Sequence, residues 1–425
     1  MSVKRPHSLT EVAAAGLCSG CGLCAGLARG GAVRMAMTQE GFLRPSVARD
    51  IDPEEHARLL EMCPGHRVGP PAAGAPHLDT HWGPYRRLVK AHATDPVLRH
   101  RGSSGGVISA IAQHLLESSR VKFILHVTAD PSASLRSRIQ LSRNRNDLLE
   151  ATGARYGPAA PLARLDEALA WDLPFAIIGK PCDIAGVRNL ARRDPRVDRL
   201  VRYTISFFCG GVSSLCISEQ IVGKYGLEEK DVATLRYRGW GCPGATNIAA
   251  KDGRIFEQTY DQTWSEELNQ DIQFRCKICA DSTGEHADIV CGDAWETLDG
   301  YAHVEHDGWN SVIARTAAGD ALLRDTEAAG VIATLPLSID ALDRIQPHQV
   351  ERKAQMLARL VGLRLSGEPV PDYRGLRLLR SAWAEWRKFL PSVLGTYRRV
   401  KAGANREVTT ARAPEDPVPP ATRPS

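Results

Sequence analysis

The sequence predicts a protein of the mixed α+β or α/β class, with a cysteine-rich segment at its N-terminus and a basic helical tail at its C-terminus. Three observations support this prediction. Cysteines recur at every third position near the start of the chain, strand-like runs alternate with glycine-rich turns and helical patterns through its middle, and arginine is concentrated near its end. The length of 425 residues is enough for two or three domains, each with its own core.

The cysteine-rich segment covers residues 1–70. Its C-x2-C-x2-C run (Cys18, Cys21 and Cys24) resembles that of bacterial ferredoxins, in which a fourth cysteine followed by proline ligates another cluster. Here an alanine occupies that fourth position, and a Cys-Pro pair begins at Cys63 instead. We therefore predict a ferredoxin-like segment that holds one [4Fe–4S] cluster through these four cysteines. The alternatives are chance thiols or a zinc site, but zinc sites usually pair two C-x2-C hairpins.

Local signals define the elements around these cysteines. Ser8, followed three residues later by glutamate, is typical of a helix N-cap, so a short helix is expected before the cysteine run. Residues 33–47 fit a small hairpin. Asp52 followed by proline predicts the start of a helix that ends just before Cys63. Residues 67–85 are rich in Gly, Pro and Ala and are expected to form a linker.

A run of small residues opens the next region. Ser103, Ser104, Gly105 and Gly106 directly precede an apolar helical pattern over residues 107–116. The N-terminus of a helix presents free amides that bind anions, so a phosphate or pyrophosphate is one ligand expected there. The alternative is a flexible turn whose glycines only cap the helix. The run fits neither the P-loop pattern nor the dinucleotide-binding pattern.

The middle of the chain has the strand, turn and helix rhythm of an α/β domain. Strands are expected at residues 121–127, 175–179, 199–208 and 308–315, a hairpin at 247–258, and helices at 148–155, 184–190, 214–224 and 321–328. Two of these strands end next to Cys182 and Cys209. Ligands in such sheets bind at the carboxyl ends of strands, where two strands of one sheet can bring these cysteines close together.

A second metal site is predicted from the remaining cysteines. Cys276 and Cys279 form a C-x2-C pair, and with Cys182 and Cys209 they make a plausible second [4Fe–4S] site. Cys242 is a rival ligand because it precedes a proline within a glycine-rich bend. Two further cysteines, Cys216 and Cys291, are interpreted as buried packing residues. The alternative for the whole set is a lone C-x2-C pair among inert thiols.

Composition excludes several other classes of protein. No apolar stretch follows the first ten residues, so no signal peptide is expected, and no run of eighteen apolar residues predicts a membrane span. Cysteines bunched in this way are typical of metal or redox sites in a cytoplasmic protein rather than of a disulfide framework. The sequence contains no nucleic-acid reader motif.

The basic tail is the third feature. Residues 374–406 contain nine Lys or Arg and one acidic residue, so this segment alone has a charge of +8, whereas the whole chain has +5. Apolar residues within 376–400 follow a helical spacing, with a break expected near Pro391. The tail can lie on an anionic membrane surface, dock an acidic partner, or cover the body with its aromatics; we favour the last. Residues 409–425 are rich in proline and are expected to be disordered.

Several motifs together resemble the coenzyme F420 hydrogenase/dehydrogenase beta-subunit family over roughly residues 10–330. They are Arg101 to Gly106, Gly179-Lys180-Pro181-Cys182, Phe208-Cys209, Cys276-x2-Cys279-x-Asp281, Ala287-Asp288-Ile289 and Gly292-Asp293. The resemblance implies an N-terminal family domain at 86–170 and a C-terminal family domain at 171–345. The basic helical tail then covers residues 346–425. It also implies a mixed α/β flavin and iron–sulfur domain behind the ferredoxin-like segment.

This resemblance implies an FAD-containing iron–sulfur oxidoreductase. Family members act on deazaflavin F420 as subunits of hydrogenases and formate dehydrogenases, relatives reduce chlorophyll-type tetrapyrroles, and others occur with polysaccharide genes. The stretch 236–244 is similar to the polysaccharide-associated group. A flavin exchanges hydride and single electrons, and clusters exchange single electrons. The implied partners are therefore an electron-donor protein, such as ferredoxin or a redox subunit, and a small-molecule hydride acceptor or donor.

The resemblance also assigns residues. Cys182, Cys209, Cys276 and Cys279 match family motifs as ligands of the second cluster. Residues expected at the FAD are Ser103, Ser104, Gly105, Gly106, Arg155 and Tyr156, and Lys180 is expected to place a catalytic charge near the flavin or an anionic substrate. Two rival functions remain: a relay subunit that transfers electrons without catalysis, and a metal-dependent scaffold in a polysaccharide-assembly complex.

Overall fold

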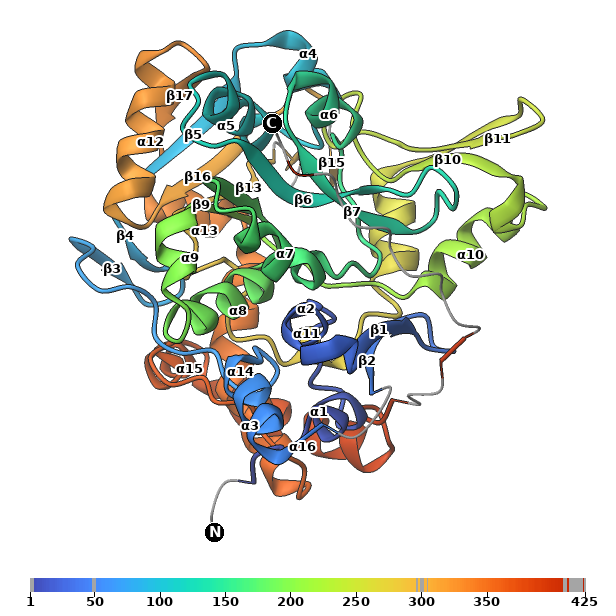
Figure 1. Ribbon diagram of the computed structural model, residues 1–425, viewed down its shortest axis with the longest axis vertical. Helices are drawn as coiled ribbons and strands as arrows, with labels where there is room; N and C mark the ends of the chain where they lie inside the picture. Colours follow the sequence, from blue (N-terminus) through green and yellow to red (C-terminus); the bar gives the residue numbers. More distant parts are fainter. Residues whose placement is uncertain are drawn as a thin grey trace.

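The computed structural model describes residues 4–47, 51–295, 297–298, 302–303, 305–407, 411–412 and 423. Its centre is an eight-stranded mixed sheet with the order β17-β5-β16-β13-β9-β8-β6-β7 (Figure 1). The inner strands β13, β9, β8 and β6 are parallel, and the outer strands are antiparallel to their neighbours. The strands are β5 (Arg87–Ala93), β6 (Phe123–Ala129), β7 (Ser137–Ser142), β8 (Phe175–Ile178), β9 (Val201–Phe207), β13 (Ile289–Asp293), β16 (Asn310–Ala314) and β17 (Ile332–Pro336).

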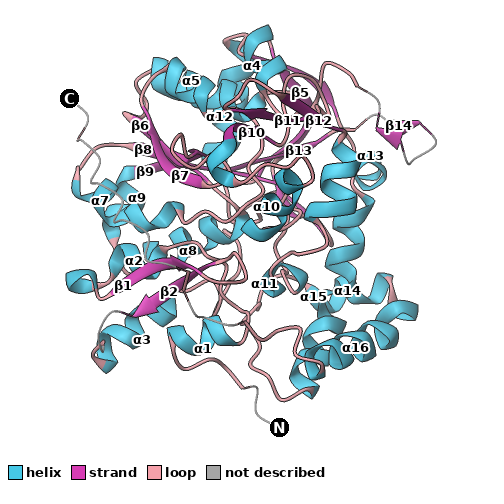
Figure 2. Ribbon diagram, turned by 90° about the vertical axis from the view of Figure 1, so that its right-hand side faces the viewer, coloured by secondary structure: helices cyan, strands magenta, loops and turns pink. Residues whose placement is uncertain are grey.

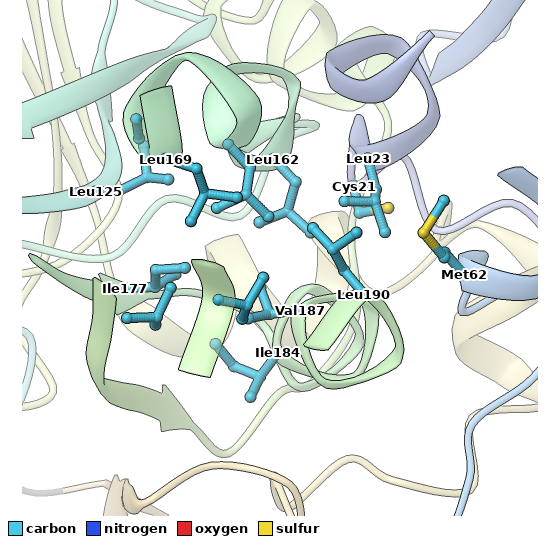
Figure 3. Packing of buried hydrophobic residues seen from close by; sticks show 14 of the residues in the cluster. Cys21, Leu23, Met62, Leu125, Leu162, Leu169, Ile177, Ile184, Val187 and Leu190 are labelled. Carbon is cyan, nitrogen blue, oxygen red and sulfur yellow. The ribbon is translucent and has the colours of Figure 1, made fainter. Parts of the chain in front are cut away.

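Helices cover both faces of this sheet, because its inner strands alternate their side chains between two apolar cores. Phe123, Leu125 and Ile177 pack with one layer of helices, whereas Ile124 and Ala176 pack with the other. Figure 2 shows the two layers, and Figure 3 shows the first core from close by. The first layer contains η2 (Pro161–Arg164), α7 (Leu165–Ala170), α8 (Pro181–Ala191) and α9 (Pro195–Leu200); the second contains α5 (Val107–Glu117) and α12 (Ala317–Ala328).

The N-terminal segment packs below the first helical layer (Figure 2). Leu23 and Met62 from this segment meet Leu190 of α8 in one core (Figure 3). Both predicted helix starts are confirmed: Ser8 Oγ accepts the Glu11 amide at 2.9 Å, and Asp52 Oδ1 accepts the amides of the first turn that follows it. The elements are α1 (Leu9–Ala14), α2 (Leu23–Leu27), η1 (Arg29–Gly31), β1 (Val33–Met37), β2 (Leu43–Val47) and α3 (Pro53–Met62).

The expected linker at 67–85 is wrong in its second half. It contains the hairpin β3 (His77–Asp79) and β4 (Gly83–Tyr85), which is paired in an antiparallel register. Trp82 is buried with Ile313 and Leu342, and its indole Nε1 donates to Asp343 Oδ1 at 2.6 Å. A large aromatic side chain with both its ring and its polar atom satisfied fixes this segment to the body.

Several helix and strand ends also differ from expectation. The helix expected at 148–155 is α6 (Arg145–Glu150), because Asn144 caps it earlier and Gly153 adopts a left-handed φ of 95° soon after it ends. The strand expected at 199–208 is shortened at its start by α9, which Asp194 caps. The hairpin expected at 247–258 is confirmed.

The remaining elements complete the body. They are α4 (Pro96–Arg101), α10 (Leu215–Gly223), η3 (Glu229–Asp231), the three-stranded sheet β10 (Val232–Arg236), β11 (Thr246–Ala250) and β12 (Ile255–Gln258), the π-helical η4 (Gln262–Leu268), α11 (Phe274–Lys277), the pair β14 (Thr297–Leu298) and β15 (Ala302–His303), and α13 (Ile339–Ile345).

Three C-terminal helices pack beside the N-terminal segment at the lower end of the molecule (Figures 1 and 2). They are α14 (Pro347–Leu365), α15 (Leu378–Ala384) and α16 (Trp386–Lys401). The predicted break near Pro391 is wrong, since the helices part at Glu385 and the proline lies inside α16. The expectation that the tail aromatics cover the body is also wrong, because Trp383 and Trp386 are exposed. Among the described residues, no helix is long and apolar enough to cross a membrane.

A buried ion-pair network ties α14 to the loop before β13. Lys353 Nζ lies 2.6 Å from Glu285 Oε1 and donates to the Ala280 carbonyl at 2.7 Å. Arg377 also pairs with Glu285, whose side chain is fully buried. Loss of one partner from such a network leaves a charge buried and incompletely paired.

We expect Lys353→Met to lower the free energy of unfolding by about 3–5 kcal/mol, because Glu285 would keep only part of its compensation. Urea unfolding followed by circular dichroism measures this loss. The matched control is Lys388→Met, which removes an exposed ion pair with Glu351 and is expected to leave the midpoint unchanged. Equal midpoints for all three proteins would contradict the stabilising role of the network.

Burial lowers the pKa of His126 on β6 from 6.5 to about 4. The unfolded chain therefore binds a proton below about pH 6.5 that the folded protein does not accept, and stability falls as the pH is lowered. This histidine alone should lower the free energy of unfolding by about 2 kcal/mol when the pH falls from 7 to 5. In urea unfolding, His126→Gln should reduce the pH dependence of the free energy of unfolding by that amount. His348→Gln, at an exposed position, should not reduce it.

Candidate functional site

The first four predicted cysteine ligands line one cavity. Cys18, Cys21, Cys24 and Cys63 meet there, with apolar side chains from the surrounding helices. The loop that supplies three of them turns through Gly22, which has a left-handed φ of 83°, and a Cβ atom at this position would lie 2.9 Å from Ala160. The close approach of the loop to the η2 region therefore requires glycine.

Burial dominates the electrostatics of this first thiol set. It raises the pKa of all four thiols, that of Cys63 to about 11, and neighbouring thiols raise the pKa of Cys21, Cys24 and Cys63 further. Backbone amides oppose the effect, as the Gly20 amide donates to Cys18 Sγ at 3.4 Å and the amides of Gly65 and His66 donate to Cys63. Thiols in such a site become thiolates when a bound metal compensates the charge.

The other four predicted ligands line a second cavity. Cys182 lies in the first turn of α8, Cys209 follows β9, and Cys276 and Cys279 lie in and just after α11. The cysteines after β8 and β9 thus meet at the carboxyl edge of the sheet, as expected. Burial raises the pKa of Cys209 to about 12, with contributions from Cys276 and Cys279. Arg352 of α14 fixes the loop by donating to the Cys209 carbonyl at 2.8 Å.

The three other cysteines lie outside both cavities. The rival ligand Cys242 is buried beside Ser104 and Asp293. Cys291 is buried in the sheet core, as predicted. Cys216 is only half-buried, so its predicted core position is wrong; its Sγ accepts from Arg412 Nη2 at 2.9 Å.

Two residues connect the thiol sets. Ser19 lines both cavities. The buried Arg275 interacts electrostatically with Cys18 and Cys63 of the first set and with three cysteines of the second. Its Nη2 donates to the Pro64 carbonyl at 3.1 Å. Within the described part of the chain, the Nε and Nη1 atoms of Arg275 and the Oγ of Ser19 are buried without a hydrogen-bond partner.

These unpartnered donors bear on whether the thiols fit an iron–sulfur cluster or a zinc ion. A buried donor without an acceptor is costly, and the sulfide atoms of a cluster would accept from it. Among the described residues, no three His, Cys, Asp or Glu side chains lie close enough to hold a single metal ion. Four thiols around each cavity, with spare donors beside them, therefore fit an iron–sulfur cluster better than a zinc ion.

Lys180 belongs to the second thiol set rather than to the Ser103 region. Its Nζ lies 2.9 Å from Asp183 Oδ2 and donates to the Ala159 carbonyl at 3.2 Å. The negative charge of Asp183 and the nearby Cys182 outweigh burial and raise the pKa of Lys180. A charged amine therefore lies at this cavity.

The small-residue run at 103–106 contacts the buried Arg238 through Ser103. Its guanidinium bonds the Ser103 carbonyl, Asp293 Oδ2 at 3.1 Å and the Tyr156 hydroxyl at 3.4 Å. It also lies over the rings of Tyr260 and Trp295, whose centroids are 5.0 and 4.7 Å away. Three of the predicted cofactor residues, Ser103, Ser104 and Tyr156, are thus brought together.

The other predicted cofactor residues have structural contacts. A Cβ atom on Gly105 or Gly106 would lie 2.9 Å from Ala91 or 2.6 Å from Leu98, so both glycines permit close packing. The Val107 amide that opens α5 donates to Asn310 Oδ1 at 3.3 Å. Arg155 directs its guanidinium to backbone carbonyls, including those of Leu135 at 3.0 Å and Leu235 at 3.0 Å.

Sequence reasoning missed both central arginines. The signal for Arg275 is its position directly before the C-x2-C pair, where a cation is adjacent to two thiols. The signal for Arg238 is a basic residue at the entrance of the glycine-rich bend 239–244. Their contacts with segments far away in the sequence appear only in the folded chain.

Comparisons with known proteins agree with this arrangement. The N-terminal domain model of the coenzyme F420 hydrogenase/dehydrogenase beta subunit matches residues 88–165, and the C-terminal domain model matches residues 173–339. The chain is 26% identical to the coenzyme F420 hydrogenase subunit beta of Methanococcus voltae, over 68% of this chain and 99% of the relative. It is 22% identical to the subunit of the same name from Methanothermobacter thermautotrophicus, over 65% of this chain and 95% of the relative.

A solved structure shares the fold. One chain of the xenon-derivatized F420-reducing [NiFe] hydrogenase complex from Methanosarcina barkeri superposes with a TM-score of 0.54, at 20% identity, over 70% of this chain and 99% of that chain. The two domain models together match more than half of the 425 residues. The chain therefore belongs to the coenzyme F420 hydrogenase/dehydrogenase beta-subunit family.

Proposed function

We propose that this protein is an iron–sulfur flavoprotein oxidoreductase that transfers electrons between a one-electron partner and a two-electron acceptor or donor. One observation supports this proposal above the others: two buried sets of four thiols share Ser19 and Arg275. Cys18, Cys21, Cys24 and Cys63 would hold one [4Fe–4S] cluster. Cys182, Cys209, Cys276 and Cys279 would hold the second.

The residues around the thiols have definable roles in this proposal. Bound clusters supply reversible one-electron chemistry. Arg275 and Lys180 place positive charge beside the thiolates, which offsets the cost of burying negative charge. Arg44 does the same for Cys18, with its own charge balanced by Glu407 at 2.7 Å. Cys18, Cys21 and Cys276 are buried, and the other five cysteines of the two sets are half-buried.

The proposed FAD site is the region of Ser103, Ser104, Gly105, Gly106 and Tyr156. The buried cation of Arg238 and the aromatic rings beside it are suited to an anionic, ring-containing ligand. Arg155 belongs to this site as a positioning residue, because its bonds to backbone carbonyls hold the segment that presents Tyr156. Lys180 contributes charge at the neighbouring strand end rather than a contact within this region.

The names of the relatives point to the two-electron substrate. Both of these hydrogenase subunits are named for coenzyme F420, so a deazaflavin is the first candidate hydride acceptor or donor. The one-electron partner would be a ferredoxin or another redox subunit. We place the protein in the cytoplasm, where its eleven cysteines would stay reduced. The second candidate function is a relay subunit without flavin, because these relatives are themselves subunits of larger enzymes.

Anaerobic purification with iron, sulfide and flavin analysis tests the proposal. We expect about eight irons and one FAD per chain. Iron without flavin would favour the relay function, and zinc in place of iron would contradict both functions.

Single cysteine variants test the ligand sets. Cys24→Ala and Cys209→Ala should each lower the iron content by about four, because each removes one ligand of a different cluster. The controls Cys291→Ala and Cys216→Ala should keep the full iron content. Loss of iron in Cys242→Ala, with unchanged circular dichroism, would contradict the proposed second set.

The shared guanidinium should tune reduction potentials. Arg275→Met removes a positive charge beside both thiol sets, so adding an electron becomes less favourable, and both potentials should fall by an amount on the order of tens of millivolts. Redox titration followed by electron paramagnetic resonance measures this shift. Arg275→Lys keeps the charge and should restore most of the potential. Unchanged potentials in Arg275→Met with full iron content would show that Arg275 has only a packing role.

A further inference from the structure

The helices α15 and α16 expose an unusual row of apolar side chains. Trp383 is 80% exposed, Leu379 78%, and Trp386 and Leu390 63% each. Two more apolar side chains continue the row on α16. In chain order the row consists of Leu379, Trp383, Trp386, Leu390, Leu394 and Tyr397, which we call the outer stripe. The spacing of three or four residues places Leu379 and Trp383 on one face of α15, and the other four residues on one face of α16.

The opposite face of α16 is already packed against the body. Val393, Thr396 and Val400 are buried, and Val400 belongs to the same apolar core as Leu360 and Leu363 of α14. Gly362 of α14 allows this approach, since a Cβ atom there would lie 2.5 Å from the Val393 carbonyl. The outer stripe is therefore not needed to fold the helices onto the body.

The chain itself leads away from the stripe after α16. Asn405 packs against Gly16, Glu407 pairs with Arg44 of β2, and Arg412 pairs with Glu219 of α10. These contacts lie on the N-terminal segment and on α10. The described part of the C-terminal segment thus runs over the body instead of covering the stripe.

Charge identifies the kind of surface that fits the stripe. The two helices contain six Lys or Arg and no acidic residue, and Glu385 between them is paired with Lys388 at 3.3 Å. Arg380, Arg387 and Arg398 are exposed, and each comes directly after a residue of the outer stripe. Exposed tryptophan and leucine bordered by arginine and lysine are characteristic of helices that lie in the interface of an anionic bilayer.

We propose that α15 and α16 dock this protein onto an anionic membrane surface, with the outer stripe inserted at the headgroup level and the flanking arginines on the lipid phosphates. A single file of six side chains is narrow for a protein partner, because stable protein interfaces bury about 800 Å² on each side. This inference does not depend on the proposed redox function.

Vesicle co-sedimentation of the full-length holoprotein tests the proposal. The probes are vesicles of phosphatidylcholine with phosphatidylglycerol, compared with phosphatidylcholine alone. We expect at least about tenfold stronger partitioning to the anionic vesicles and a loss of binding at high salt. Trp383→Ser with Trp386→Ser should weaken partitioning about tenfold or more. Arg387→Glu with Arg398→Glu should remove the preference for anionic lipid.

Both tryptophans are exposed, so their replacement should leave folding and iron content unchanged. The matched control is Ile255→Ser on β12, which is 69% exposed and lies at the other end of the molecule (Figure 2); it should bind like the parent protein. Equal binding to both vesicle types, or binding that survives the double tryptophan variant, would overturn the proposal. A self-association in the ultracentrifuge that the tryptophan variant abolishes, without vesicle binding, would also overturn it in favour of a second copy.

Discussion

The burial of eight thiols is the physical constraint on which the rest of this structure depends. Removing a thiol from water opposes its ionisation, so each buried set needs either a positive metal centre or nearby cations to become a set of ligands. The chain supplies two features that favour a metal centre, namely grouped sulfurs and nearby cations. It places four sulfurs around each cavity, and it directs Arg275, Arg44 and Lys180 to the same neighbourhood.

The architecture meets this constraint by using the carboxyl edge of a parallel sheet. Strands β8 and β9 end beside each other, which delivers Cys182 and Cys209 to one cavity. The long helix α14 then holds the loops from outside: Arg352 bonds the carbonyls after β9, and Gln349 accepts from Ser282 at 2.7 Å. The C-terminal helix α14 is therefore part of the site, although the family models end at residue 339.

Local sequence signals predicted the N-terminal segment well, because its four cysteines are close in sequence and its helices begin at strong caps such as Asp52. The grouping of Cys182, Cys209, Cys276 and Cys279 was predicted from a C-x2-C pair and two strand ends and also matched family motifs. The structure brings these four residues to one cavity. Long-range contacts were harder to predict. The buried Trp82 packs half of the expected linker against the body. The guanidinium of Arg275 acts on thiols of the first set that lie more than two hundred residues earlier in the chain. Predicted helix boundaries were wrong where an unrecognised cap, such as Asn144, lay upstream of the expected start.

The two thiol sets differ in how much of the chain must be ordered before each is complete. The first set lies between Cys18 and Cys63, within one segment that has its own helices and hairpin. The second set joins Cys182, Cys209 and the pair at Cys276 and Cys279, and it needs β8, β9 and α11 in place together. Closing longer loops costs more chain entropy and is slower. Loading of the two proposed clusters should therefore follow an order, with the N-terminal set maturing first and the second set waiting for the completed sheet.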